Sequence, residues 1–145
     1  MSVRPARADD AGAVAAVLRQ LGYEPGAGEV SARLAQLDAD GRSAAYVAEA
    51  GGAITGVLTL HVVPVLHEPG GWCRITVLVV AEDARRRGAG RELVAAAEAF
   101  ARAARCSRIE VTSALHRAGA HDFYRGMGFE QVSEHFLKRM AVPGG

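Results

Sequence analysis

The chain passes from an apolar run, Ile75-Thr76-Val77-Leu78-Val79-Val80, directly into the polar and glycine-rich sequence Ala81-Glu82-Asp83-Ala84-Arg85-Arg86-Arg87-Gly88-Ala89-Gly90. The first part is rich in β-branched residues, as is typical of a central strand buried on both faces of a sheet. Apolar residues then recur at helical spacing between 93 and 104, and residues 108–112 again favour a strand. This order of strand, helix and strand predicts an α/β protein with helices covering a central sheet.

The segments on either side of this stretch also have regular patterns. The spacing of apolar residues predicts helices over 10–21, 30–37 and 118–127, and strands over 44–49, 54–63 and 129–140, the last as one or two closing strands. Asp9 or Asp10 has a side chain suited to capping the first helix, and Gly51-Gly52 predicts a hairpin turn.

Composition limits the class of protein. The chain has 145 residues, half of them hydrophobic, which predicts one domain over 1–145. Its formal charge of +1 gives no overall attraction to nucleic acid or to a membrane. With no apolar stretch of about 20 residues and no apolar leader, we expect a cytoplasmic protein. Cys73 and Cys106 form no metal-ligand spacing, so no metal is predicted.

The loop before Gly88 has the chemistry of a diphosphate site. Glycines permit close approach of the backbone, the helix start offers unpaired amides, and Arg85, Arg86 and Arg87 add positive charge. The lysine of a P-loop and the third glycine of the dinucleotide fingerprint are both missing. The alternative is a solvated arginine turn before an ordinary helix.

Two motifs in this chain resemble those of the GNAT family of N-acetyltransferases. Residues 78–93 contain Arg85-x-x-Gly88-x-Gly90 after a buried strand, similar to the family's acetyl-CoA-binding motif. Residues 117–129 include Ala120, Tyr124 and a final Gly-Phe, similar to its closing motif. The resemblance implies a GNAT fold, with a mixed central sheet of about six to seven strands flanked by four helices, and acetyl-CoA as co-substrate.

The resemblance also implies which residues contact the cofactor. The pantetheine arm would bind the backbone of the central strand, where it diverges from its neighbour, and the pyrophosphate would rest on the loop. The implied cofactor-binding residues are Leu78, Val79, Val80, Arg85, Arg86, Arg87, Gly88, Ala89, Gly90, Arg91, Arg117 and Tyr124.

Two catalytic residues are predicted. Tyr124 matches the tyrosine that protonates the departing thiolate in many relatives; the alternative is core packing. Relatives often carry a glutamate base at the position of Arg74, which cannot accept a proton at neutral pH. His61 is therefore the first choice as base, because histidine ordinarily titrates near neutrality; the alternative is a histidine that merely ends a strand. Other candidates are His67, Glu68, Glu110, His116, His121 and ordered water.

The resemblance thus predicts an enzyme that transfers acetyl from acetyl-CoA to the amine of a small molecule by direct attack. A non-catalytic acyl-CoA-binding module is the alternative, and an interaction domain with an accidental loop is the third reading. A looser similarity to aminoalkylphosphonate N-acetyltransferases favours an acceptor with an acid beside the amine, provided that Arg74 faces it rather than pairing with Glu68 or Asp83. By analogy with relatives, a homodimer joined through the C-terminal strands is expected.

Overall fold

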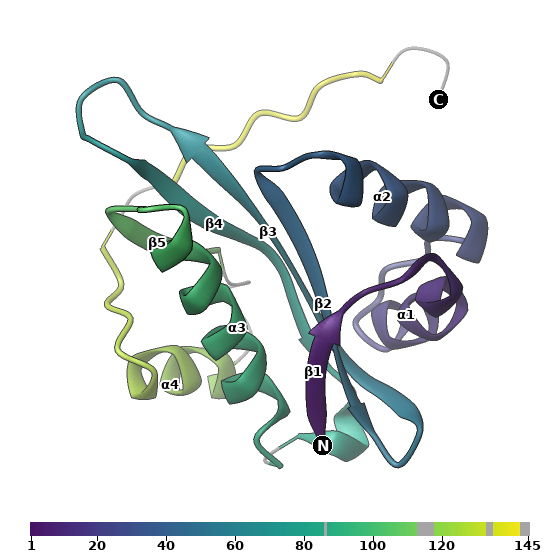
Figure 1. Ribbon diagram of the computed structural model, residues 1–145. Helices are drawn as coiled ribbons and strands as arrows, with labels where there is room; N and C mark the ends of the chain where they lie inside the picture. Colours follow the sequence, from purple (N-terminus) through teal and green to yellow (C-terminus); the bar gives the residue numbers. More distant parts are fainter. Residues whose placement is uncertain (86, 113–117, 133–134, 143–145) are drawn as a thin grey trace. The chain divides into compact units, whose positions relative to one another are not determined.

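The computed structural model describes residues 1–85, 87–112, 118–132 and 135–142 (Figure 1). The chain divides into two compact units, Met1–Thr112 and Ser113–Gly145. The first unit contains the sheet and three of the α-helices, and the second contains the fourth. That residues 1–145 fold as one domain stays a prediction.

A five-stranded sheet forms the centre of the first unit. Its strands follow one another in the order of the sequence: β1 (Ser2–Pro5), β2 (Ser43–Ala50), β3 (Ala53–Pro64), β4 (Gly71–Val80) and β5 (Arg108–Val111). Neighbours are antiparallel except β4 and β5, which are parallel and joined through a helix, as a parallel connection requires. The predicted hairpin is confirmed, and both turn glycines, Gly51 and Gly52, have positive φ.

In the described part of the sheet β3 is the middle strand, so residues 75–80, which were predicted to form the central strand, instead belong to an interior strand one place further along. β4 lies fourth in the order, and its side chains are buried only in part: Ile75 and Val79 are buried, whereas Thr76 is exposed. The apolar run reflects packing on both faces near the helices, but a polar residue is tolerated where no helix covers the strand.

Helices cover both faces of this sheet (Figure 1). On one side lie α1 (Ala11–Arg19) and α2 (Ala27–Ala39), which pack with Val47 and Val57 in one buried cluster. On the other lies α3 (Ala89–Ala103), whose apolar face is buried with Leu58, Leu60 and the inner faces of β4 and β5. The three predicted helices of this unit are therefore confirmed.

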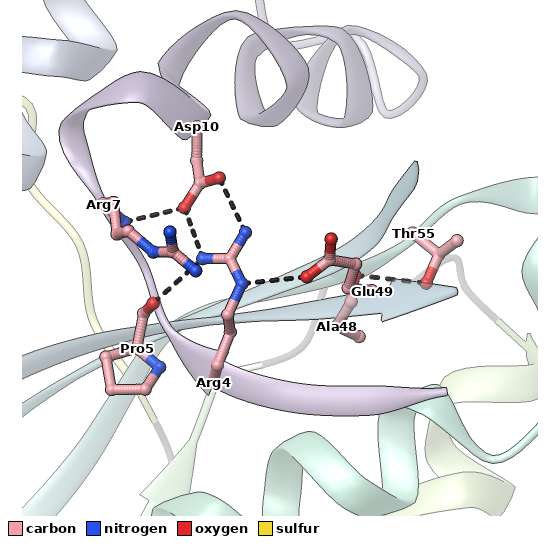
Figure 2. Close-up of polar contacts among 7 residues, drawn as sticks. All are labelled: Arg4, Pro5, Arg7, Asp10, Ala48, Glu49 and Thr55. Carbon is pink, nitrogen blue, oxygen red and sulfur yellow. Dashed lines mark hydrogen bonds and ion pairs between the residues drawn. The ribbon is translucent and has the colours of Figure 1, made fainter. Parts of the chain in front are cut away.

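A network of charged groups fixes the start of the chain to the sheet (Figure 2). Arg4 on β1 donates two hydrogen bonds of 2.9 Å to the Asp10 carboxylate and a third, also of 2.9 Å, to Glu49 on β2. Asp10 also accepts from the amide of Arg7 at 2.7 Å. Asp10 is 7% exposed, and it ends the short 3-10 helix η1 (Ala8–Asp10). The predicted aspartate cap of the first helix is wrong, because no side chain caps α1 and the Asp10 carboxylate binds Arg4 instead.

The second unit contains α4 (Ala118–Gly126), which confirms the predicted last helix. Gly128 has a φ of 91° just beyond it, and the amide of Phe129 bonds the carbonyl of Tyr124 at 2.9 Å. Residues 129–132 and 135–142 contain no strand, so the predicted closing strands are wrong in the described residues. A strand needs a neighbour to satisfy its backbone groups, and no other strand is described in this unit. The described sheet consequently has five strands rather than six or seven.

Candidate active site

One edge of β4 loses its neighbour halfway along the strand. β4 pairs with β3 from Gly71 to Val80, but with β5 only from Trp72 to Ile75. Beyond Ile75, β4 has a strand partner on one side only among the described residues. We call this stretch, which includes Leu78 and Val80, the open edge of β4, because no second strand pairs with it in the described residues. That a cofactor binds there stays a prediction.

A β-bulge marks the point where this divergence begins. Thr59 on β3 pairs with Val77, but the next residue, Leu60, pairs with Ile75. Thr76 is thus an extra residue on β4, and a bulge of this kind redirects the side chains that follow it. The Thr76 hydroxyl lies 2.6 Å from that of Thr59, which places both on the same face of the sheet.

The predicted phosphate loop lies at the end of this open edge. β4 continues into a second 3-10 helix, η2 (Glu82–Ala84), and α3 begins at Ala89. Arg85 Nε donates to the carbonyl of Val80 at 3.2 Å, so its guanidinium lies beside the end of the strand. Arg85 and Arg87 are exposed, and Arg86 lies outside the described residues. The loop therefore joins an open strand edge, exposed cations and a helix N-terminus.

Close packing fixes the start of α3 at this position. Leu93 is fully buried, and a Cβ atom on Gly56 of β3 would stand 3.0 Å from its Cδ1 and 3.1 Å from the carbonyl oxygen of Val79. Ala89, the first helical residue, is 2% exposed. The amides of the first turn, which have no acceptor within the helix, are thus held on a rigid element.

The loop depends on the left-handed conformation of Gly88, which has a φ of 89° and stands at the N-cap of α3. We expect Gly88→Ala to lower the free energy of unfolding by about 1 kcal/mol, because an L side chain is strained at this φ. Urea unfolding measures the change. Gly12→Ala, within α1 where φ is negative and the space is open, is the matched control and should not destabilise the protein. Equal effects of the two substitutions would show that the Gly88 conformation is not required.

Polar side chains occupy the face of the sheet beyond α1 and α2. Side chains two residues apart on a strand share a face, so Thr59 and His61 lie on the same side as Val57, which is buried with α1 and α2. The Nδ1 atom of His61 is 2.7 Å from the hydroxyl of Ser43 and 3.6 Å from the Asp40 carboxylate. The structure thus places the predicted base on this polar face, with a side chain that is 41% exposed.

Arg74 lies opposite His61 on β4. Its ion-pair partner is neither Glu68 nor Asp83, the two that were expected. Arg74 Nε lies 2.6 Å from Glu110 on β5, its direct neighbour in the parallel register, rather than near Glu68 or Asp83. Arg108 lies 3.4 Å from the other oxygen of Glu110. These three side chains, which we call the arginine–glutamate cluster, carry a net charge of +1 and lie on the same face as His61.

The other side chains near this cluster are held in place. The Arg108 guanidinium stacks on Trp72 at 3.2 Å from the ring centroid. Glu68 accepts hydrogen bonds from Trp72 at 2.9 Å and from Ser107 at 2.8 Å, and the Trp72 bond in particular lowers the pKa of Glu68. A carboxylate held in this way is a weak proton acceptor, which leaves Glu68 a poor candidate for the base.

Comparisons with known proteins agree with this geometry. The sequence profile of the acetyltransferase (GNAT) family matches residues 14–129, which is most of the chain. The chain belongs to the GNAT family. The aminoalkylphosphonate N-acetyltransferase of Salmonella typhimurium is 33% identical over 89 residues, which span 61% of this chain and 58% of that protein. This chain therefore matches little more than half the length of that curated relative.

Solved structures share the GNAT fold over nearly the whole chain. A candidate acetyltransferase from Agrobacterium tumefaciens superposes with a TM-score of 0.86 at 28% identity, covering 97% of this chain and all of the other. An aminoglycoside N-acetyltransferase solved with coenzyme A gives a TM-score of 0.80 at 14% identity, covering 97% of this chain and 100% of the other. At this lower identity the likeness shows the fold alone.

Gly90 and Arg91, two further predicted cofactor residues, lie in the first turn of α3. The other predicted site residues that follow fall in the second unit or outside the described residues. Tyr124 lies on α4, half-buried, and its ring packs edge-on against Phe123 and Phe129 with centroids 5.5 and 5.8 Å away. His121 lies on the same helix. Arg117 and His116 lie outside the described residues, so their predicted roles stay predictions.

Neither a metal cluster nor a reactive thiol is found among the described residues at this site. No group of three His, Cys, Asp or Glu side chains that could hold a metal lies within the described ranges. Cys73 is buried beneath α3, and burial raises the pKa of its thiol to about 11, which makes it unreactive. Among the helices described, none has the length and apolar character needed to cross a membrane.

Sequence reasoning missed Asp40 and Ser43 as parts of the site, and it named Glu110 only as a candidate base, not as the partner of Arg74. The alternation of side chains along a strand offered one signal for the Arg74–Glu110 pair. Residues 72 and 74 share a face of the sheet with residues 108 and 110, their partners on the parallel strand. The bulge at Thr76, which brings Arg74 to the face of His61, leaves no such signal in a single sequence.

Proposed function

We propose that this chain is an N-acetyltransferase that passes the acetyl group of acetyl-CoA to the amine of a small molecule by direct attack. The observation that carries the proposal is the open edge of β4, which runs directly into the glycine–arginine loop at the start of α3. An extended amide-bearing arm suits the strand edge, and a diphosphate suits the loop.

The cofactor would bind mainly to the backbone. Its pantetheine arm would lie along Leu78, Val79 and Val80, and its pyrophosphate would accept hydrogen bonds from the first amides of α3. The exposed guanidinium groups of Arg85 and Arg87 would add charge-assisted contacts. Arg85 lies at the carbonyl of Val80, where the arm and the diphosphate would meet. Arg86, Ala89, Gly90, Arg91 and Arg117 complete the proposed set.

The reaction needs three protein groups besides this binding. A base removes a proton from the acceptor ammonium so that the free amine can attack the thioester carbonyl, and we assign this role to His61. A backbone N–H near Val80 would stabilise the oxyanion that forms. The Tyr124 hydroxyl would then protonate the departing thiolate of coenzyme A.

The acceptor is proposed to carry an acidic group near its amine. Arg74 and Arg108 share the carboxylate of Glu110, and Arg108 also lies near Glu68, so the Arg74 side of the arginine–glutamate cluster offers a guanidinium beside the proposed base. The guanidinium groups of such a cluster favour a phosphonate or carboxylate on the acceptor. The Glu110 carboxylate would attract the acceptor's ammonium group. The aminoalkylphosphonate N-acetyltransferase among the relatives fits this class of acceptor.

Binding of coenzyme A tests the proposal most directly. We expect acetyl-CoA at one hundred times its Kd to stabilise the protein by about 2.7 kcal/mol, measured by thermal shift and calorimetry. Replacing Arg85 and Arg87 together with alanine should weaken coenzyme A binding by about tenfold or more, because bonds to charged groups are lost, while binding of pantetheine, which lacks the diphosphate, should not change.

The matched control is Arg33→Ala, which removes an exposed arginine from α2. Absence of any binding of coenzyme A or its acyl forms would contradict the proposal. Tight binding without thiol release across amines, amino acids and aminophosphonates would instead support a non-catalytic acyl-CoA-binding module. The cytoplasmic location and the homodimer stay predictions.

A further inference from the structure

We propose that Asp40 and Ser43 act as positioning residues that hold His61 in the tautomer with its proton on Nδ1, which leaves the lone pair of Nε2 free to accept the proton of the acceptor. This inference rests on the proposed function, since it concerns the base of that reaction. It assigns a role to two side chains that neither the motifs nor the comparisons single out.

Three elements of the first unit bring these residues together. Asp40 is the residue that follows α2, Ser43 opens β2, and His61 lies opposite Ser43 in the β2–β3 register. The Ser43 hydroxyl donates to Asp40 at 3.0 Å and lies 2.7 Å from His61 Nδ1. The local backbone is also fixed, because the amide of Ser43 donates to the carbonyl of Asp40 at 3.0 Å. The contacts therefore form a chain from carboxylate to hydroxyl to imidazole.

Counting protons along this chain determines the tautomer. An ionised carboxylate only accepts hydrogen bonds, and a serine hydroxyl has a single proton to donate. If the hydroxyl proton points to Asp40, the Ser43 oxygen can only accept from His61, so Nδ1 must carry a hydrogen. In the opposite tautomer Nδ1 carries no hydrogen, so Nδ1 and the Asp40 carboxylate would both need the single proton of the Ser43 hydroxyl. One of the two hydrogen bonds would then be lost.

Asp40 stays ionised because its oxygens have donors. The amide of Arg42 bonds its Oδ1 at 2.9 Å, and this bond, followed by that of Ser43, lowers the pKa of the Asp40 carboxyl. At neutral pH, Asp40 is therefore an acceptor for the Ser43 proton. Its negative charge, 3.6 Å from Nδ1, would also stabilise the imidazolium that forms when Nε2 takes a proton.

The charged groups around His61 come from both neighbouring elements. Asp40 and Ser43 approach from the end of α2 and from β2, and Arg74 lies opposite on β4 with Glu110 beside it. His61 thus has a carboxylate, Asp40, on the side of β2 and a guanidinium, Arg74, on the side of β4.

The proton transfers balance with these groups. The acceptor ammonium gives one proton to Nε2, and its nitrogen lone pair forms a bond to the thioester carbonyl carbon. The carbon–sulfur bond then breaks, with its electron pair leaving on sulfur, and the thiolate takes the proton of the Tyr124 hydroxyl. The nitrogen of the new amide still carries one surplus proton, which passes to the tyrosinate directly or through solvent, and the imidazolium returns its own proton to solvent. The ammonium and the thioester thus give an amide, a thiol and one released proton.

Nitrogen NMR of the imidazole tests the tautomer directly and needs no substrate. The expected result in protein labelled at histidine is a protonated Nδ1 and an unprotonated Nε2 for neutral His61. Ser43→Ala should shift His61 toward a mixture of tautomers, and Ser43→Thr, which keeps the hydroxyl, should restore the original spectrum. Ser31→Ala on α2 is the matched control. A protonated Nε2 in the unaltered protein, or a spectrum unaffected by Ser43→Ala, would overturn the inference.

Kinetics then link the tautomer to the reaction. We expect Ser43→Ala to lower kcat by about tenfold with little change in KM, as is typical when the partner of a functional histidine is removed. His61→Gln should lower kcat by about 10²- to 10⁴-fold. In that background Ser43→Ala should have no further effect, whereas independent effects of the two substitutions would contradict the inference. Loss of coenzyme A binding would refute the proposed function, while the NMR result would stand separately.

Discussion

Tyr124→Phe is expected to lower kcat by about 10²- to 10⁴-fold, the usual contribution of a positioned proton donor. The substitution removes only the hydroxyl, because phenylalanine keeps the edge-on packing of the ring against Phe123 and Phe129. Because the ring and its packing are kept, affinity for acetyl-CoA should stay within about twofold. A thiol-release assay at saturating acetyl-CoA, combined with calorimetry, measures the two quantities separately.

Tyr46→Phe is the matched control for this substitution. Tyr46 lies on β2 and packs with the buried cluster beneath α3, so loss of its hydroxyl should leave turnover unchanged. An unchanged kcat for Tyr124→Phe would reject Tyr124 as the general acid. It would also favour the alternative in which this tyrosine serves only to pack α4 against the turn that follows it.

Asp10→Ala is expected to lower the free energy of unfolding by about 2–3 kcal/mol, because it removes both hydrogen bonds between Asp10 and the part-buried Arg4 guanidinium, which keeps only Glu49 as a charged partner. For a chain of this size, the loss corresponds to a fall in Tm on the order of 10 °C. Chemical unfolding and calorimetry measure it. The neighbouring and exposed Asp9 offers the control Asp9→Ala, which should cost little.

The same carboxyl makes stability depend on acid. The hydrogen bond from Arg4 lowers the folded-state pKa of Asp10, so its contribution is complete above the unfolded value of about 3.9 and is lost as pH falls below it toward the folded value. Between about pH 6 and about pH 3, the free energy of unfolding of Asp10→Ala should fall less steeply with acid than that of the unaltered protein. If both proteins lost stability in parallel, other carboxyl groups would account for the acid sensitivity.

The fold of the first unit could be predicted largely from local patterns. The apolar run 75–80, the helical spacing from 93 onward and the glycine pair at 51–52 each specify an element over a short distance. Where β4 lies in the sheet could not be read in the same way. Strand order depends on which edges pair, and a buried run has the same appearance in the second strand from an edge as in the middle.

The candidate site was predicted unevenly for the same reason. The loop at Gly88 and Tyr124 belong to contiguous motifs, which a single sequence displays. The partners of Arg74 and His61 come from strands far away in the chain, and the bulge at Thr76 changes which side chains share a face. The Arg4–Asp10 pair shows a different limit, because Asp10 has the spacing of a helix cap but its carboxylate binds a guanidinium only six residues away on β1.

The predicted closing strands are absent from the described residues 129–132 and 135–142, because the prediction considered composition and not a neighbouring strand to pair with. Val132, Phe136, Leu137, Met140 and Val142 give residues 129–142 the composition of strands, yet each of these side chains is exposed. Composition specifies that a segment can be extended, whereas a sheet requires a second backbone at the right distance.

The open edge of β4 has a consequence for how freely this protein can diverge in sequence. If the peptide groups of Leu78 and Val80 hold the cofactor, the recognition is carried by atoms that every amino acid except proline supplies. Side chains along this edge can then be substituted as the packing of the core allows, without loss of binding of the shared co-substrate. Substrate preference would depend on side chains such as Arg74, so a single substitution can change it while the cofactor stays the same.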